Sequence, residues 1–295
     1  MAYVERVNRA IDHIVRHLAS PLSLADVAAA ACFSPFHFHR VFKALMGETL
    51  HDFIKRQRLE RALHLMSHTP GQSLTQIALA CGFTSSSDFS RSFKQRYGTA
   101  PSAFDLAAFR DHQREAFEQL MHEQLGPGHL MHLPAGHNPD GFEVRLRDLP
   151  ARTVAYLRVL DPYRDGGVKA ACARLVTWAQ ARGVAGGQWL GYMWEEPEVV
   201  ALPHCRYDVA VVVNDVQPDG EIGRFDFPPM TVAEVMMRGD LALEARAIDW
   251  LYKTWLPGSG YVPDDQPAFE AWVGMPYAHG EAYFELACQL PVRPN

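Results

Sequence analysis

The feature that most constrains this sequence is an internal repeat in its first third. Residues 24–33 match residues 74–83 at an offset of 50, sharing the pattern L-x-x-(V/I)-A and a later Phe. Residues 38–47 match residues 89–98 at an offset of 51, sharing F-x-R-x-F-K-x-x-x-G. Both copies have the apolar spacing of helices. Two matched helix pairs, each with a tight turn, predict a tandem helix-turn-helix.

From residue 142 onward the apolar pattern changes to alternation, which is typical of strands. We expect strands at 142–146 and 154–159, a helix at 168–182, and strands at 189–194 and 207–213. A second cycle follows, with strands at 224–227 and 232–237, a helix at 243–256, and strands at 269–273 and 282–290. The Thr-Val-Ala tripeptide at 153–155 recurs at 231–233. The predicted fold is multidomain: an all-α tandem helix-turn-helix N-terminal domain and an α+β C-terminal domain of two strand-helix-strand-strand repeats.

Residues 109–140 are expected to form a linker, because Gly-Pro-Gly, Pro-Ala-Gly and Asn-Pro-Asp-Gly turn formers follow one polar-faced helical stretch. Five histidines fall here, namely His112, His122, His129, His132 and His137. No fixed spacing to Cys or carboxylate ligands accompanies them, so we expect a solvated linker without a metal. The expected domains are therefore 1–108 and 141–292, with the linker between them.

Charge and composition narrow the class of protein. The net charge of −6 divides into +5 for residues 1–110 and −11 for residues 111–295, which suggests a polyanion-binding module joined to an acidic domain. Hydrophobic residues make up 48%, an ordinary globular content. No apolar run is long enough for a membrane span, and the N-terminus does not resemble a signal peptide. Five scattered cysteines fit a reducing compartment, so a cytoplasmic location without a membrane partner is expected.

The second helix of each pair is expected to enter the major groove of double-stranded DNA. The candidate DNA-binding residues are the polar, basic and aromatic side chains on the predicted outer face of these helices: Phe36, His37, His39, Arg40, Lys43, Ser86, Ser87, Asp88, Arg91 and Lys94. Arg pairs bidentately with guanine, and Ser bonds to several bases. Lys43 and Lys94 lie farther along their helices and suit phosphates better. Helix packing needs the repeated Phe residues but not the repeated exposed cations, which favours a role in DNA binding.

Residues 77–102 carry a more specific pattern, I-A-x-x-C-G-F-x-S-x-x-x-F-S-R-x-F-K-x-x-x-G-x-x-P-S. This pattern resembles the signature of the AraC/XylS family of bacterial transcription regulators, and the resemblance extends over about residues 5–108. It implies one chain that places two recognition helices in successive segments of the major groove. The first copy departs from the pattern at one position, where Cys32 stands in place of Gly82 of the second copy.

The C-terminal half shows no nucleophile motif, phosphate loop or metal spacing, and no cofactor is expected. Alternation puts Tyr192 and Trp194 on one face of a strand, and Glu270 and Trp272 on one face of another. With Tyr156 as a fifth candidate, these side chains are predicted to form an aromatic cavity with one carboxylate, suited to an amphipathic cation. The alternative is that the aromatic rings fill a core while Glu270 points outward.

Residues 141–292 resemble the GyrI-like small-molecule-binding domain, through L-G-Y-x-W-E-E-P at 190–197, R-Y-D at 206–208, and the stretches near 255–261 and 269–270. The resemblance implies a cleft between two repeats that binds hydrophobic, often cationic compounds, with Glu270 as the buried counter-charge. Trp272 stands where the family usually has a tyrosine.

The leading hypothesis is a sequence-specific DNA-binding transcription regulator, not an enzyme, whose C-terminal domain binds a small hydrophobic, cationic effector. Two alternatives stay open. In one, the GyrI-like domain hydrolyses reactive small molecules, with Glu270 as the base and Tyr192 as a helper. In the other, the acidic domain is a protein-interaction module, with RNA polymerase among the candidate partners.

Overall fold

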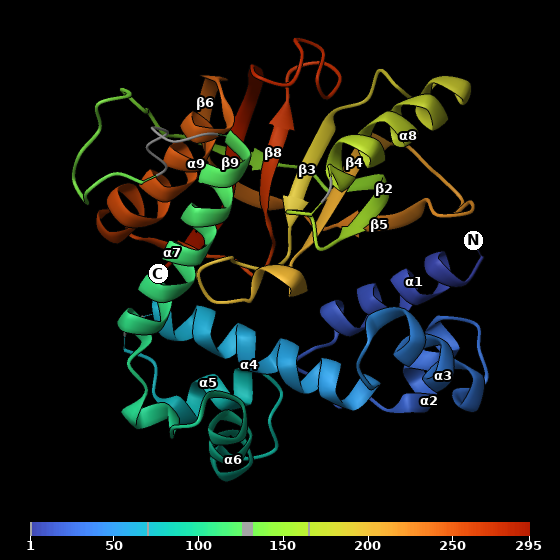
Figure 1. Cartoon of the computed structure of the whole chain (residues 1–295), viewed down its shortest axis with the longest axis vertical. Coiled ribbons are helices and arrows are strands. Elements are labelled where there is room, and N and C mark those ends of the chain that lie inside the picture. Colours follow the sequence, from blue (N-terminus) through green and yellow to red (C-terminus); the bar gives the residue numbers. More distant parts are fainter. Residues whose placement is uncertain (1, 70, 126–131, 165) are drawn as a thin grey trace. The chain divides into compact units, whose positions relative to one another are not determined.

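The computed structural model describes residues 2–69, 71–125, 132–164 and 166–295 (Figure 1). The chain divides into two compact units: residues 1–112 with 218–223, and residues 113–217 with 224–295. Within the described ranges, no helix combines the length and the apolar character that crossing a membrane requires.

The first unit is helical and confirms the predicted tandem helix-turn-helix. Its elements are α1 (Ala2–Arg16), α2 (Leu24–Ala30), α3 (Pro35–Met46), α4 (Leu50–His68), α5 (Leu74–Ala80), α6 (Ser86–Tyr97) and a short 3₁₀ turn, η1 (Pro101–Ala103). Side-chain oxygens of Ser23, Ser73 and Ser85 cap the N-termini of α2, α5 and α6. The matched glycines, Gly47 and Gly98, end α3 and α6 in the left-handed conformation.

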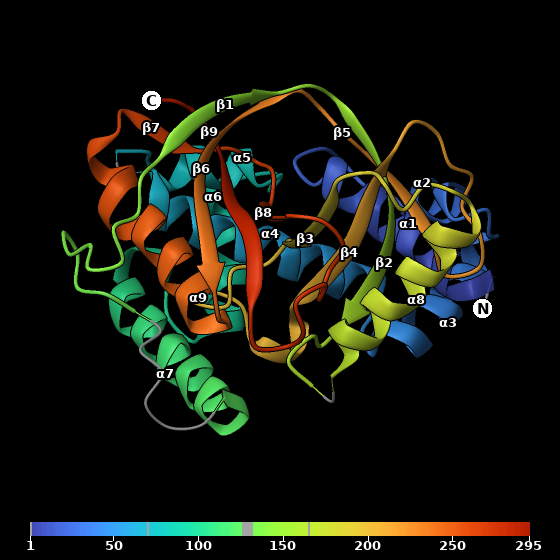
Figure 2. The ribbon, with the colours of Figure 1, turned by 90° about the horizontal axis from the view of Figure 1, so that it is seen from above.

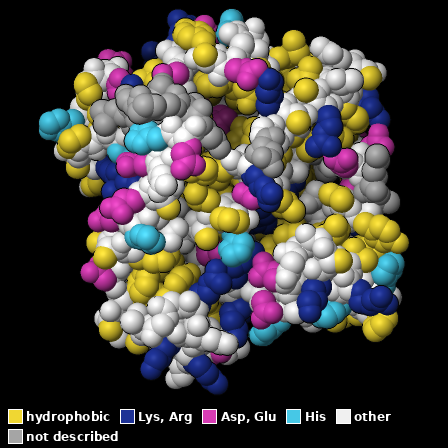
Figure 3. Space-filling model, in the orientation of Figure 1, with side chains coloured by type: hydrophobic (Ala, Val, Ile, Leu, Met, Phe, Trp, Pro, Cys, Tyr) yellow, Lys and Arg dark blue, Asp and Glu magenta, His cyan; other side chains and the backbone are white. Residues whose placement is uncertain are grey.

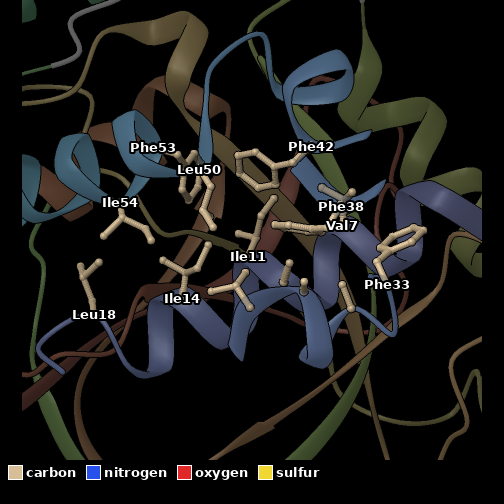
Figure 4. Packing of buried hydrophobic residues seen from close by; sticks show 14 residues of the cluster. Val7, Ile11, Ile14, Leu18, Phe33, Phe38, Phe42, Leu50, Phe53 and Ile54 are labelled. Atoms are coloured by element: carbon tan, nitrogen blue, oxygen red, sulfur yellow. The ribbon is translucent and has the colours of Figure 1, made fainter. Parts of the chain in front are cut away.

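The repeated apolar residues form the cores of the two copies. In the first copy, Phe38 and Phe42 of α3 are fully buried against α1 and Phe53 of α4 (Figure 4). Phe89 and Phe93 of α6 are fully buried in the second copy. The repeat in the sequence is therefore explained by two similar cores, while the matched residues Arg40 and Arg91 between these Phe residues are exposed.

The turn between α5 and α6 lies very close to the residues that directly follow α1. Gly82 has φ +84°, and a Cβ atom built on it would lie 2.5 Å from the carbonyl oxygen of Leu18. Arg58 of α4 reinforces this junction by donating hydrogen bonds to the carbonyls of Leu18 (3.0 Å) and Ser20 (2.8 Å). Cys32, the counterpart of Gly82, adopts the same left-handed region with φ +54°. The first turn thus keeps a positive φ at this position despite the change from Gly to Cys.

Gly82→Ala should destabilise the chain more than Gly98→Ala. Both residues have positive φ, but a Cβ at Gly98 meets nothing within 4 Å. Gly98→Ala is expected to cost about 1–2 kcal/mol of unfolding free energy for the left-handed backbone. Gly82→Ala adds the clash with Leu18, roughly 1–3 kcal/mol more. Urea unfolding of both variants measures the difference, and equal losses would contradict the close approach.

α7 (Leu106–Leu125) occupies the first part of the expected linker and spans the boundary between the two units. Phe109, near its start, packs on Tyr97 and Phe104 of the first unit. Phe117, farther along, packs on Tyr163 of the second unit, where Met121 also joins a small buried cluster. One helix therefore contributes to the packing of both units.

The second unit is an α+β fold, as predicted. Its strands are β1 (Arg145–Leu149), β2 (Arg152–Leu160), β3 (Trp189–Met193), β4 (Arg206–Val213), β5 (Gly223–Phe227), β6 (Met230–Gly239), β7 (Tyr261–Pro263), β8 (Ala268–Trp272) and β9 (Phe284–Pro294). Its main helices are α8 (Gly167–Ala181) and α9 (Leu241–Trp250). A π-helical turn (Leu251–Trp255) and a 3₁₀ turn (Leu256–Gly258) follow α9, and another 3₁₀ turn covers Leu202–His204.

The described strands form one sheet in the order β1-β6-β9-β8-β3-β4-β2-β5, with β7 added beside β9. The repeats are β2-α8-β3-β4 and β6-α9-β8-β9, which confirms the predicted strand-helix-strand-strand pattern. Each repeat is preceded by a short strand that pairs with the other repeat, because β1 joins β6 and β5 joins β2. The expected first strand at 142–146 begins three residues later, at Arg145.

Both α8 and α9 lie on one face of the sheet (Figure 2). The two repeats meet at the antiparallel pairing of β3 with β8, in which Gly191 is opposite Glu270 and Tyr192 is opposite Phe269. Because side chains alternate along a strand, Gly191 and Glu270 share one face while Tyr192 and Phe269 share the other. This register decides which residues can act together.

Candidate functional site

The outer face of α3 presents the residues that the sequence predicts for it. Phe36, His37, His39, Arg40 and Lys43 are all exposed, whereas Phe38 and Phe42 between them are fully buried. Phe36 is 76% exposed, an unusual position for a large apolar ring, and Arg40 lies over it at 6.0 Å. The helix therefore offers one aromatic and several basic or polar groups on a single face.

The outer face of α6 is more polar. Ser87, Arg91 and Lys94 are exposed, and Ser86 and Asp88 are half-buried. Asp88 has a local role, since its backbone N–H is capped by Ser85 Oγ at 3.1 Å and its carboxylate accepts a hydrogen bond from Thr84 at 3.4 Å. Arg91 and Lys94 repeat the positions of Arg40 and Lys43 and are exposed like them.

A second site lies on the helix face of the sheet, at the junction of the two repeats. Glu270 of β8 is half-buried, and its Oε2 accepts a hydrogen bond from the Tyr207 hydroxyl of β4 at 2.5 Å. Glu244 of α9 is buried, and its carboxyl group interacts electrostatically with that of Glu270. Burial raises the pKa of Glu270, while Tyr207, Glu244 and Trp272 lower it in part. Burial and the charge of Glu270 raise the pKa of Glu244 well above its ordinary value.

The half-buried Glu270 and the buried Glu244 differ from the other buried carboxylates of this unit. Those carboxylates each have a basic partner: Asp208 with Arg158, Glu195 with Arg206, Glu234 with Arg147, and Asp249 with Lys253. Among the described residues, no Lys, Arg or His forms an ion pair with Glu244 or Glu270 or contributes to their pKa shifts. Buried charge without a counter-charge is costly. The arrangement therefore suits an added cation.

Aromatic rings and neutral groups surround the two carboxyls. Trp272 packs against Tyr277 at 5.5 Å and Phe284 at 5.5 Å. Tyr277 is held at φ +59°, a strained conformation for a residue with a side chain. Figure 3 shows the molecular surface, and its upper part has a recess with hydrophobic side chains on the walls and acidic atoms at the bottom. This combination can accommodate an apolar body that carries positive charge.

The structure brings together only two of the five residues predicted for the cavity. Glu270 and Trp272 share the helix face of β8, but Tyr156, Tyr192 and Trp194 belong to a core cluster with Phe269 on the opposite face. Trp194 Nε1 instead donates a hydrogen bond to Asp208 at 3.2 Å. The reason is register, because Tyr192 pairs with Phe269 rather than with Glu270. We therefore exclude these three aromatic residues from the site.

Sequence reasoning missed three residues of this site: Gly191, Tyr207 and Glu244. Tyr207 and Gly191 lie in strands that the alternating pattern does locate, but only the strand order brings them to Glu270. Glu244 lies on a different element, 26 residues earlier in the chain, and nothing in its local sequence distinguishes it from a solvated helical glutamate.

The linker histidines do not all share one environment. His112, His122 and His137 are exposed, and His129 lies outside the described residues. His132 is half-buried, with Nδ1 3.0 Å from Asp249 and Nε2 3.3 Å from Glu118. Glu198 lies near it, but Arg114 pairs with Glu198 at 3.0 Å and Lys253 pairs with Asp249 at 2.5 Å. These basic partners make the cluster an ion-pair network that joins the segment after α7 to α9.

Gly191→Ala should disrupt the carboxyl site, because a Cβ at this position would lie 1.8 Å from the Tyr207 hydroxyl and 2.5 Å from Glu270 Oε2. We expect a loss of about 1–3 kcal/mol in unfolding free energy from this overpacking. Gly186→Ala is the matched control, since its Cβ would meet nothing within 4 Å. Thermal and urea unfolding compare the two, and an unchanged stability of Gly191→Ala would show that the phenol and carboxyl are not held there.

Comparisons with known proteins give separate matches for the helical N-terminal part and the α+β C-terminal part of the chain. A helix-turn-helix domain model matches residues 7–107, and a GyrI-like small molecule binding domain model matches residues 142–293. The probable transcriptional regulator LumQ of Photobacterium leiognathi is 35% identical over 105 residues, which are 35% of this chain and 42% of LumQ. The chain thus spans less than half the length of that relative.

Two further comparisons cover one domain each. A DNA gyrase inhibitor of Edwardsiella piscicida is 31% identical over 165 residues, which are 52% of this chain and 100% of the inhibitor. The crystal structure of the DNA-binding domain of AdpA in complex with a target DNA is similar at 27% identity and a TM-score of 0.34, covering 37% of this chain and 96% of that one. The chain belongs to the GyrI-like small-molecule-binding family, and it carries an AraC-type helix-turn-helix domain ahead of that domain.

Proposed function

We propose that this chain is a transcription regulator that binds double-stranded DNA through α3 and α6 and a small hydrophobic cation through the site at Glu270. The single observation that supports this best is that Glu270 and the buried Glu244 have no basic partner among the described residues. The proposed domains are residues 1–108 for DNA and residues 141–292 for the effector.

The DNA-binding part of the proposal is supported by the repeated exposed cations. Arg40 and Arg91 lie at matched, exposed positions on the two candidate recognition helices. An arginine side chain can donate two hydrogen bonds to one guanine. Lys43 and Lys94 follow one turn later and are suited to phosphate contacts. The remaining proposed contacts are Phe36, His37, His39, Ser86, Ser87 and Asp88.

The effector part is supported by chemistry that the rest of the domain does not share. A ligand cation beside Glu270 would supply the counter-charge that the other buried carboxylates obtain from Arg or Lys. Trp272 and Tyr277 would contact its apolar body. One relative reported above is named a DNA gyrase inhibitor, and that name refers to a protein partner. Binding of gyrase by this chain is therefore an alternative outcome of the same binding studies.

Arg40→Ala and Arg91→Ala should each weaken binding to a specific DNA site by about 1–3 kcal/mol and change binding to random DNA little. The site is obtained by selecting a random-sequence DNA pool with the wild-type chain, and affinities are measured by fluorescence anisotropy over a salt series. Arg174→Ala, which removes an exposed arginine from α8, is the control and should bind like wild type. If the pool yields no enriched sequence, or if all three variants behave alike, the role assigned to α3 and α6 is wrong.

Glu270→Gln should remove cation binding. We expect phenyltrimethylammonium to bind wild type, and its uncharged isostere tert-butylbenzene to bind much more weakly. Loss of the carboxylate should cost about 2–5 kcal/mol for the cation and little for the neutral compound, since only the charge is removed. Titration calorimetry measures the cation, and competition with it measures the isostere. Equal binding of both compounds to wild type would mean that the site selects by shape and not by charge.

A further inference from the structure

Arg152, the first residue of β2, places a guanidinium group on the face of the sheet opposite Glu270. It shares this face with Val154 and Tyr156 of the same strand, because side chains alternate along a strand. The Nε and Nη2 atoms of Arg152 are buried and have no hydrogen-bond acceptor among the described residues. Within the same described ranges, no Asp or Glu forms an ion pair with Arg152. Its positive charge therefore lacks a counter-charge.

Two aromatic rings contact this guanidinium group. Its Cζ atom lies 4.4 Å from the centre of the Phe269 ring of β8 and 5.8 Å from that of the Phe227 ring of β5. Such rings attract the charge, but they do not provide the oxygen acceptors that the Nε–H and Nη2–H groups need. Burial lowers the pKa of Arg152 to about 10, and Tyr192 raises it only in part. The group thus stays charged at neutral pH, although the structure compensates its burial incompletely.

The two other buried arginines on the strands of this unit show which group is missing. Arg158 donates from Nε and Nη2 to the two carboxylate oxygens of Asp208, at 2.8 and 2.6 Å. Arg206 uses the same two nitrogen atoms to bind Glu195. Arg152 has the same pair of donors free of any acceptor among the described residues. A carboxylate is therefore the group that these two donors fit best.

We propose that Arg152 binds the carboxylate of a small molecule with an aromatic or other apolar body, through paired hydrogen bonds from Nε and Nη2. Arg152 is half-buried, so its side chain is in contact with solvent as well as with the core. Leu149 and Trp194 are partly buried members of the same cluster, and they offer apolar surface to the body of the ligand. This anion site lies on the other face of the sheet from Glu270 and does not depend on cation binding there.

The first test measures the binding of benzoate to the full wild-type chain by titration calorimetry, beside acetate and benzamide. Acetate has the carboxylate without the ring, and benzamide has the ring without the charge. Benzoate should bind at least about tenfold more tightly than acetate, since a buried phenyl ring contributes that much. It should also bind about tenfold more tightly than benzamide, because hydrogen bonds to a charged group are stronger. Equal binding of benzoate and benzamide, or no binding of benzoate, would overturn the proposal.

Variants of Arg152 then locate the site. Arg152→Met replaces the guanidinium by an apolar side chain, so the affinity for benzoate should fall about thirtyfold or more. Arg152→Lys keeps the charge but cannot present two parallel N–H donors, so it should also lose most of the affinity.

Arg182→Met is the matched control. Arg182 follows α8, is exposed, and lies over the Trp178 ring at 4.6 Å, so this change removes an arginine with an aromatic contact that is open to solvent. It should bind benzoate like wild type. Thermal unfolding shows whether each variant is folded, and the three ligands on wild type test the proposal without any variant. Folded Arg152 variants that bind benzoate like wild type, or an equal loss in Arg182→Met, would contradict the assignment to Arg152.

Discussion

The pairing of β3 with β8 is the contact on which the second unit depends. It joins two strand-helix-strand-strand repeats into one sheet and aligns Gly191 with Glu270. Gly191 leaves the space that Tyr207 and Glu270 fill, since a Cβ would overlap both. A shift of one residue would move Glu270 to the opposite face and bring Phe269 under the helices. The geometry of the candidate site therefore follows from the same register that holds the repeats together.

The electrostatic state of the site follows from where this register puts its carboxyls. Burial and the charge of Glu270 together raise the pKa of Glu244 well above its ordinary value. Elsewhere in the unit, buried acids are stabilised by arginine or lysine, as Asp208 is by Arg158 at 2.6 Å. Glu244 and Glu270 have no such partner among the described residues, and Glu270 accepts a hydrogen bond from the Tyr207 hydroxyl. A bound cation would therefore stabilise the charge of these carboxyl groups.

The sequence predicted the first unit in detail because both copies repeat the core residues and the residues that begin and end the helices. Phe38 and Phe89 are buried, Ser23 and Ser73 cap helices, and Gly47 and Gly98 end them, all at positions a pattern can locate. Most strands and both main helices of the second unit were also predictable from periodicity. Of the five residues predicted for the effector site, the structure brings together only the two that share β8, because the positions of the others depend on pairing between distant strands.

Two examples show why that part could not be read from sequence. Tyr192 and Glu270 each lie in a correctly located strand, but their faces depend on a register that alternation alone does not specify. Glu244 joins the site only because α9 packs across the same face as α8. Glu270 was predicted because a carboxylate flanked by aromatic residues in a strand is unusual, and that signal is local.

The most direct test of the account is the effect of a bound cation on DNA affinity. If the two sites are coupled, a bound cation changes the affinity of the chain for DNA. Bound DNA must then change the affinity for the cation by the same factor. The account predicts that saturating phenyltrimethylammonium changes the affinity of the wild-type chain for its selected DNA site by about fivefold or more, and leaves Glu270→Gln unchanged. A wild-type chain that binds the cation but shows the same DNA affinity with and without it would contradict the account.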